Sequence, residues 1–359
     1  MAPTTVPTRL PNDLPPPAVT PGPVRATPLP ADRPVRWGIL ATGRIARSFA
    51  TALALLPDAE IAAVGARRLA AAEEFAAAYG ARRAHGGYAS LVADPDVDVV
   101  YVASPHSLHR EHVLMAFDAG KAVLCEKALT LTGDEAAELV SESRRRGLFL
   151  MEAMWMRCNP VIRRVQQLLA TGDLGQVTQV RADLGWYVEA PPTDRLLDPM
   201  LGGGALLDMG VYTLAFAHLF LGEPDALAAV AGLGDSGIDL NVAMSLGYAS
   251  GAVASLTASM TGATPRTGSI ATERGRFDLA DSFHHPVRAT WTSDEVTETV
   301  EAPLLGNGLA HEAKEVMRCL RAGETESPLV PLDESVAIMR QMDRIRREIG
   351  VTYAADRQD

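Results

Sequence analysis

Residues 35–46 read Val-Arg-Trp-Gly-Ile-Leu-Ala-Thr-Gly-Arg-Ile-Ala, and this stretch decides the fold. An apolar run typical of a buried strand leads through a turn of small residues into a helix-like run. Ala41, Gly43 and Ala46 occupy the places where a dinucleotide fingerprint needs a tight turn, a close approach to the pyrophosphate and close packing of helix on strand. The alternative is a structural strand-to-helix turn.

A pyrophosphate bound at this turn would rest on the amide groups of the helix N-terminus, which have no partner within the helix. The first of the three places holds alanine instead of glycine, so a Cβ enters the tight turn. We expect cofactor contacts from Ala41, Thr42, Gly43, Arg44 and Ile45.

Strand-like and helix-like runs alternate after Val35. The expected strands are Val35–Ala41, Ile61–Ala66, Val97–Ala103, Ala122–Cys125 and Leu148–Met151. The expected helices between them are Ala46–Leu56, Leu69–Tyr79, Leu108–Ala119 and Gly133–Arg146. Because strands that are apolar on both faces are typical of parallel sheets, residues 35–157 are predicted to form an α/β Rossmann domain with a doubly wound parallel sheet.

The pattern changes near residue 158. Helices are expected at Pro160–Ala170 and Ala205–Leu221, and consecutive strands then predict an α+β domain over residues 158–359 with a large, mostly antiparallel open sheet. These strands are Ala226–Leu233, Asp239–Tyr248, Ala252–Met260, Thr267–Ala271, Gly275–Leu279, Val287–Thr292 and Val296–Glu301. Two further helices are expected at Leu309–Arg321 and Glu334–Ile349, the last with Asp333 as N-cap and in a position to pack back on the Rossmann domain.

Residues 1–34 differ from the rest of the chain. They hold eleven of the 24 prolines and few large apolar residues, so they cannot bury enough surface to offset the entropy of ordering. This segment is predicted to be a disordered or extended arm.

The composition limits the classes of function. With 47% hydrophobic and 21% charged residues among 359, the chain is typical of a soluble globular protein with two domains. The net charge of −11 argues against nucleic acid as a partner. We find neither a secretory signal nor an apolar run long enough to span a membrane. Three widely spaced cysteines favour reduced thiols in the cytoplasm over disulfides or a metal site.

Two arginines, Arg67 and Arg68, follow the second expected strand. A fold that prefers NAD usually places an acidic residue there for the ribose 2′-hydroxyl. An arginine fork instead suits a 2′-phosphate through charge-assisted bidentate contacts. The pair favours NADP, with NAD still open. In the alternative interpretation, both arginines start a solvated helix.

Polar residues follow the strands that end near residues 103 and 125. Since ligands of an open parallel sheet bind beyond the carboxyl ends of its strands, these residues should border the cofactor cleft. Lys127 is either a surface residue or a cation beside the nicotinamide. His106 and His109 are either structural or part of the site. The candidates for cofactor contacts are Ser104, Pro105, His106, His109, Glu126 and Lys127.

Residues 202–212 read Gly-Gly-Gly-Ala-Leu-Leu-Asp-Met-Gly-Val-Tyr. Each glycine costs a helix about 1 kcal/mol against alanine, so three in a row indicate a close approach of the backbone, which we assign to substrate or cofactor. A helix would place Asp208 and Tyr212 on one face, where an acid and a phenol are suited to proton transfer. The alternative is a tight turn before a packed helix.

Five motifs, taken in order, resemble the Gfo/Idh/MocA oxidoreductases, and the resemblance covers most of residues 35–350. It is closest to the branch of glucose–fructose oxidoreductase, NADP-dependent D-xylose dehydrogenase and dimeric dihydrodiol dehydrogenase. The motifs are Ala41–Ala46, Pro105 with His109, Glu126-Lys127, Glu152–Arg157 and Gly202–Tyr212.

The resemblance implies an NAD(P)-dependent oxidoreductase for a sugar, a cyclic polyol, a trans-dihydrodiol or the corresponding ketone. Lys127 matches the lysine of the family's Glu-Lys-Pro motif, and Tyr212 takes the acid/base position, with Asp208 beside them in the substrate pocket. A nearby ammonium group lowers the pKa of a phenol, so Lys127 would assist Tyr212. A homodimer or homotetramer through the C-terminal sheet is also implied.

Trp155 and Arg157 are expected to line the substrate pocket, because an indole face suits the C–H surface of a sugar or an aromatic diol. Core packing is the alternative for Trp155, and a contact to the second domain is the alternative for Arg157. Trp186, Tyr187 and Arg195 flank the same region without a defined place.

Two residues depart from the family pattern. Ala128 replaces the motif proline, which puts in doubt any peptide geometry that the proline fixes, and His106 stands where asparagine is common. Two other functions stay open: an enzyme with tightly bound NAD(P) that cleaves glycosides or exchanges sugars without net redox change, and a non-catalytic protein that senses NADPH. The proline-rich arm is either inert or lies across a neighbouring subunit.

Overall fold

The computed structural model describes residues 26–353 and residue 356, which form two compact units. The N-terminal unit contains the described residues up to Trp155 together with residues 305–339. The C-terminal unit contains residues 156–304 and the described residues from Arg340 onward. The expected arm lies, up to residue 25, outside the described residues.

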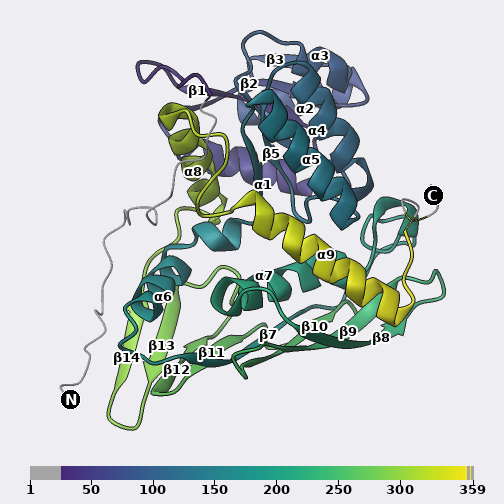
Figure 1. Ribbon diagram of the computed structural model, residues 1–359. Coiled ribbons are helices and arrows are strands. Elements are labelled where there is room, and N and C mark those ends of the chain that lie inside the picture. Colours follow the sequence, from purple (N-terminus) through teal and green to yellow (C-terminus); the bar gives the residue numbers. More distant parts are fainter. Residues whose placement is uncertain (1–25, 354–355, 357–359) are drawn as a thin grey trace. The chain divides into compact units, whose positions relative to one another are not determined.

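The N-terminal unit is built on a six-stranded parallel sheet (Figure 1). The strand order β3-β2-β1-β4-β5-β6 is that of a doubly wound dinucleotide-binding sheet, which confirms the expected Rossmann fold. Strands β4 and β5 are buried along their whole length, as in a sheet covered on both faces. The strands are β1 (Val35–Leu40), β2 (Ala59–Gly65), β3 (Arg83–His85), β4 (Val99–Val102), β5 (Ala122–Cys125) and β6 (Leu150–Glu152).

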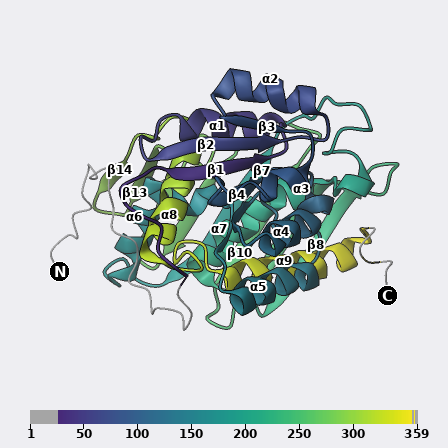
Figure 2. The ribbon, with the colours of Figure 1, turned by 90° about the horizontal axis from the view of Figure 1, so that it is seen from above.

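Helices cover both faces of this sheet, with α1 packed beside α2 and α4 beside α5 (Figure 2). Local sequence fixes the ends of α5: the Thr132 side chain accepts the Glu135 amide, and Gly147 ends the helix with a φ of 64°. The helices are α1 (Arg44–Leu53), α2 (Leu69–Tyr79), α3 (Tyr88–Val92), α4 (His109–Asp118), α5 (Gly133–Arg146) and α8 (Leu309–Ala322).

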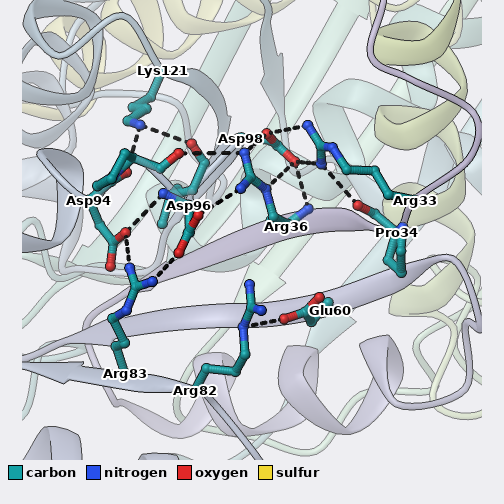
Figure 3. A network of polar contacts seen from close by, with 12 residues as sticks. Arg33, Pro34, Arg36, Glu60, Arg82, Arg83, Asp94, Asp96, Asp98 and Lys121 are labelled. Atoms are coloured by element: carbon teal, nitrogen blue, oxygen red, sulfur yellow. Dashed lines mark hydrogen bonds and ion pairs between the residues drawn. The ribbon is translucent and has the colours of Figure 1, made fainter.

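A charged network lies at the amino edge of the sheet, where β1, β4 and β5 begin (Figure 3). The Asp98 carboxylate pairs with Arg33 at 2.6 Å and Arg36 at 2.8 Å. Burial alone would raise the pKa of Asp98, but both guanidinium groups lower it to about 2. The Lys121 ammonium donates to the Asp94 carbonyl at 2.8 Å. Other members of the network are Glu60, Arg82, Arg83 and Asp96.

The C-terminal unit contains an eight-stranded sheet in the order β14-β13-β12-β11-β7-β10-β9-β8. Only β7 and β10 pair in parallel, which confirms the expected, mostly antiparallel sheet. The strands are β7 (Val177–Gly185), β8 (Ala226–Leu233), β9 (Asp239–Gly247), β10 (Val253–Ser259), β11 (Gly268–Thr272), β12 (Gly275–Leu279), β13 (Arg288–Thr292) and β14 (Thr297–Glu301).

Two helices pack on one face of the eight-stranded sheet: α7 (Val211–Leu221) on β7 and β10, and α6 (Pro160–Ala170) on β13 and β14 (Figure 1). Strand β10 shows the consequence, because Ala254, Leu256 and Ala258 are buried while the residues between them are exposed. Within the described part of the chain, no helix covers the opposite face (Figure 1). The last helix, α9 (Leu332–Ile349), belongs to the C-terminal unit from Arg340 onward.

In the sequence we found no apolar run long enough to span a membrane. The helical stretch Pro199–Leu221 corrects this: by length and composition alone it could cross one, with a mean hydropathy of 1.5. In the fold, 78% of this window is buried, as in the core helix of a globular domain. Within it, Leu206–Gly210 forms a π-helical turn, η4, that continues directly into α7.

Strands β3 and β7 and helix α3 were not predicted from the sequence. Strand β3 has only three residues and helix α3 only five, so neither shows a period. Strand β7 alternates polar residues with the buried Val180, Ala182 and Leu184, a pattern typical of a half-buried strand that we did not recognise in the sequence. The N-cap expected at Asp333 is wrong, because α9 already begins at Leu332. Asp333 instead accepts a hydrogen bond from Arg144 Nη1 at 2.8 Å, and it lies in the first turn of α9, where a negative charge interacts favourably with the helix dipole.

Candidate active site

The turn between β1 and α1 has the geometry of a phosphate-binding turn. Ala41 has a φ of +81°, a left-handed conformation usually left to glycine, and its amide donates to the Gly65 carbonyl at 3.1 Å. A Cβ on Gly43, the N-cap of α1, would meet no described atom within 4 Å. Helix α1 has neither a side-chain cap nor an acidic residue in its first turn. Its positive end therefore suits an anion.

Arg67 and Arg68 lie just beyond the carboxyl end of β2, and both are exposed. Arg68 is the N-cap of α2. Burial raises the pKa of Tyr88, and the positive charge of Arg67 opposes that rise, so the Arg67 guanidinium lies near this phenol. An anionic group at this end of the sheet would meet a concentrated positive charge.

Two histidines, His109 and His112, contact the turn after β4. His109 is fully buried, with Nε2 2.9 Å from the Ser104 carbonyl and Nδ1 3.0 Å from the Ala128 carbonyl. Burial lowers the pKa of His109 to about 4, so the neutral ring donates to one of these carbonyls at a time. His112 Nδ1 lies 2.9 Å from Ser104 Oγ. His109 thus joins the turn after β4 to the loop after β5.

Lys127 lies in the loop after β5, and its side chain is half-buried. The Lys127–Ala128 peptide bond is cis, although residue 128 is not proline. The Lys127 amide donates to Glu126 Oε2 at 3.3 Å, and the Lys127 carbonyl lies 3.1 Å from His106 Nε2. Glu126 also accepts a hydrogen bond from the Tyr101 hydroxyl. These contacts hold the backbone of Lys127 from both sides.

The last residue of β6, Glu152, supports the same loop. The buried Glu152 carboxylate accepts the Leu129 amide at 3.0 Å and the Ser335 hydroxyl at 2.6 Å. Trp155, at the end of the N-terminal unit, is half-buried, whereas Arg157 in the C-terminal unit is 6% exposed. Glu152 therefore orders the loop that contains Lys127 from the neighbouring strand.

The glycines at 202–204 approach the protein's own chain. A Cβ on Gly203 would lie 2.8 Å from the Leu196 carbonyl oxygen and 3.0 Å from backbone atoms of Asp198. A Cβ on Gly204, whose φ is +132°, would collide with the Asp239 carboxylate. The close approach that we assigned to substrate or cofactor is therefore made by residues 196–198 and the start of β9.

Asp208 and Tyr212 lie in the buried helical stretch that follows these glycines. Asp208 is 5% exposed and accepts a hydrogen bond from Arg195 Nη1 at 3.0 Å. Tyr212 is 6% exposed, and its ring centroid lies 5.0 Å from that of His284. The π turn at Leu206–Gly210 replaces the i→i+4 pattern with i→i+5, so the regular helix that we expected does not describe their spacing. π turns are frequent at functional sites.

Two residues that contact Asp208 and Tyr212 in the C-terminal unit were not assigned from the sequence. Arg195 had no defined place, and it forms the ion pair to Asp208. His284 follows β12 in sequence, and only the fold of the sheet brings it to Tyr212. The consecutive pair His284-His285 in a strand-rich region is the one signal that could have drawn attention to it.

The candidate residues divide between the two units. Lys127 and the residues that fit a dinucleotide belong to the N-terminal unit, whereas Asp208 and Tyr212 belong to the C-terminal unit. Among residues 26–353 and 356, no group of three or more His, Cys, Asp or Glu side chains could hold a metal ion. The chemistry available from these side chains is that of an ammonium group, a phenol, an imidazole and a carboxylate.

Two family models match the chain. Residues 35–154 match "Oxidoreductase family, NAD-binding Rossmann fold", and residues 162–278 match "GFO/IDH/MocA C-terminal domain". The chain is 36% identical over 340 residues to trans-1,2-dihydrobenzene-1,2-diol dehydrogenase of Homo sapiens, covering 90% of this chain and 99% of the relative. It is 37% identical over 334 residues to the enzyme of the same name from Oryctolagus cuniculus, covering 89% and 100%.

Solved structures show the same fold. KijD10, a 3-ketoreductase from Actinomadura kijaniata in complex with NADP and TDP-benzene, has a TM-score of 0.78 and 28% identity, covering 88% of this chain and 98% of that one. An aldose-aldose oxidoreductase from Caulobacter crescentus has a TM-score of 0.80 at 24% identity, covering 88% and 97%, a likeness that concerns the fold alone.

Proposed function

Because the chain belongs to the Gfo/Idh/MocA family of NAD(P)-dependent oxidoreductases, we propose that it transfers hydride between NADP(H) and a CH–OH carbon of a trans-dihydrodiol or a related cyclic alcohol or sugar. The observation that carries this substrate class is identity above one third with dihydrodiol dehydrogenases along almost their entire length. Sugars stay in the class because a 3-ketoreductase shares the fold at 28% identity.

The residues at the carboxyl edge of the parallel sheet fit the cofactor. The amides of Arg44 and Ile45 at the uncapped start of α1 suit the pyrophosphate, next to Ala41, Thr42 and Gly43. Arg67 and Arg68 are assigned to a 2′-phosphate, which favours NADP over NAD. The bound nicotinamide would supply or accept the hydride. We propose residues 35–157 as the cofactor domain and residues 158–359 as the substrate and subunit domain.

We assign Tyr212 Oη as the acid/base group that accepts the proton of the substrate hydroxyl, or donates it in the reverse direction. A free phenol has a pKa near 10, so it is a weak base at neutral pH unless a positive charge favours the phenolate. Lys127 Nζ is assigned that positive charge, and it can also stabilise a developing alkoxide. His284 adds a second titratable ring 5.0 Å from Tyr212.

We assign substrate binding to Asp208, Trp155 and Arg157. The ion pair with Arg195 orients the Asp208 carboxylate, which can accept a hydrogen bond from a substrate hydroxyl. The half-buried indole of Trp155 offers an apolar face to a ring.

The test is a substrate panel of trans-dihydrodiols, aldoses and keto-sugars with NADP(H) and NAD(H), followed by NADPH absorbance. Tyr212→Phe should lower turnover more than tenfold while NADPH still binds, because the phenolic proton is removed. Tyr187→Phe is the matched control, since Tyr187 is 67% exposed. Unchanged turnover of folded Tyr212→Phe would contradict the assignment. Cofactor that co-purifies and is not consumed would instead favour non-redox cleavage or exchange.

We propose a homo-oligomer that forms through the uncovered face of the eight-stranded sheet. Its exposed positions carry small side chains, with Val230 opposite Ala243 and Ala243 opposite Thr257 across three strands. Val230 is 71% exposed in the middle of β8. A sheet face that carries small side chains on β8, β9 and β10 and is not covered by a helix favours a second copy of the same chain.

Light scattering after size exclusion should therefore give a multiple of the chain mass of 38.2 kDa. Ala243→Arg should yield a monomer, because two guanidinium groups would face each other across the interface. Ser250→Arg, at an exposed turn, is the matched control. A monomeric wild-type protein would contradict the proposal.

A further inference from the structure

Asp239, the first residue of β9, is a fully buried carboxyl group that the sequence did not single out. Its Oδ2 accepts the amide of Leu206 at 2.5 Å, at the start of the helical stretch with Asp208 and Tyr212. Its Oδ1 has no hydrogen-bond partner within the described residues and lies where a Cβ on Gly204 would be.

The start of this helical stretch needs an acceptor from elsewhere in the fold. The first amides of a helix have no partner within it, and a side chain at the N-cap usually accepts one of them. Here the N-cap is Ala205, which has no side-chain oxygen, and Gly204 precedes it. Asp239 supplies the missing acceptor from a separate strand, and glycine at 204 leaves room for it.

Two buried side chains from the C-terminal end of the chain lie near this carboxyl group. Arg346 of α9 and Tyr353 both lie within electrostatic range of Asp239. The Arg346 guanidinium stacks on the Tyr353 ring at 4.4 Å and pairs with Asp343 at 2.6 Å and Asp356 at 2.7 Å. The C-terminal residues Arg346 and Tyr353 therefore lie near Asp239.

We propose that Asp239 is a positioning residue for the reaction: its carboxylate fixes the first turn of the stretch that contains Asp208 and Tyr212. This inference rests on the proposed role of Tyr212. A charged acceptor makes the stronger hydrogen bond to an amide, so turnover should depend on the charge of Asp239.

The charge of Asp239 changes near neutral pH. Burial raises the pKa of Asp239 to about 7, against the opposing effects of the Leu206 and Ala205 amides and of Arg346. The other ionisable group that faces it is Tyr353, whose pKa burial raises further above its ordinary value, so that it stays neutral. The carboxylate, and with it the anchored helix start, is therefore favoured as pH rises through about 7.

The test compares Asp239→Asn, Asp239→Ala and the control Asp225→Asn in the full chain. Asp225 also accepts a backbone amide, from Ala249, but it is exposed. We measure kcat, KM, NADPH binding and thermal unfolding between about pH 5.5 and 8.5. Asp239→Ala should lower kcat about tenfold with NADPH binding unchanged. Asp239→Asn keeps an acceptor oxygen without a charge, so it should lose the rise of kcat near pH 7.

A wild-type pH profile in Asp239→Asn overturns the inference, as does a kcat of folded Asp239→Ala equal to that of Asp225→Asn. If Asp239→Ala does not fold, the pH profile of Asp239→Asn decides. Tyr212→Phe is measured in parallel: if it retains turnover, the proposed function fails, whereas loss of turnover with unaffected Asp239 variants overturns only this inference.

Discussion

The two edges of the parallel sheet use polar side chains in different ways. At the amino edge, side chains of opposite charge pair with each other, as Asp98 does with Arg33 and Arg36 (Figure 3). At the carboxyl edge, polar side chains bind backbone groups instead: His109 lies between two carbonyl oxygens, and Glu152 accepts an amide. The amino edge neutralises charge within the fold, whereas the carboxyl edge fixes loop shapes. Stability and turnover should therefore respond to different substitutions.

Lys127→Met should produce the largest change and affect turnover alone. Loss of this positive charge at the carboxyl edge should lower kcat about 100-fold if Lys127 has the role that we propose for it, the stabilisation of a phenolate or a developing alkoxide. Steady-state kinetics give kcat, and thermal unfolding should match that of the wild type. Lys314→Met, at an exposed position of α8 in the same unit, is the control. Full turnover in Lys127→Met would contradict the expectation that charge at the carboxyl edge affects turnover.

Asp98→Asn should have the opposite effect. It leaves Arg33 and Arg36 without their common counter-charge, and we expect a loss of about 2 kcal/mol in the free energy of unfolding, with unchanged kcat. Urea unfolding near neutral pH measures the loss. A variant as stable as the wild type would show that the network contributes no stability.

The pH dependence of the same variant sharpens the comparison. The pKa of folded Asp98 is about 2, below its ordinary value of 3.8. The stability that Asp98 contributes is therefore complete above about pH 4 and is lost as pH falls toward 2. The difference between the unfolding free energies of the wild type and Asp98→Asn should shrink over that interval. A constant difference would exclude ionisation of Asp98 as the cause.

Arg67→Ala should give the smallest effect, and it concerns cofactor choice. Losing a charge-assisted contact to the 2′-phosphate should weaken NADPH binding about tenfold and leave NADH binding nearly unchanged. Fluorescence titration with both dinucleotides gives the two Kd values. Arg82→Ala, which removes a guanidinium that pairs with Glu60 at the amino edge, is the control. Equal weakening of both dinucleotides would refute a 2′-phosphate contact.

Local signals in the sequence were sufficient for much of the fold. Helix α2 begins and ends as expected because Gly80 takes a left-handed conformation at its C-cap, and α6 because Asn159 and Pro160 define its start. The strand-to-helix turn at Ala41 was also predictable, because small residues between an apolar strand and a helix are typical of a tight turn.

Contacts between distant residues were not predictable. Asp239 meets Leu206, and His284 meets Tyr212, only because strands far apart in sequence converge on one helix. The π turn at η4 has no local signature that distinguishes it from a regular helix. The sequence could therefore propose Tyr212 for the chemistry, but not the groups that hold it.

Strand β7 is the first strand of its sheet in sequence and lies near the middle of it in space, between β10 and β11. During synthesis it leaves the ribosome with both edges exposed, and its first neighbour, which begins at Val253, is made later than the helix η4–α7 and strands β8 and β9. Unpaired strand edges are sites of aggregation, and distant pairing slows folding. The polar residues that alternate along β7 would keep the nascent strand in solution during that interval.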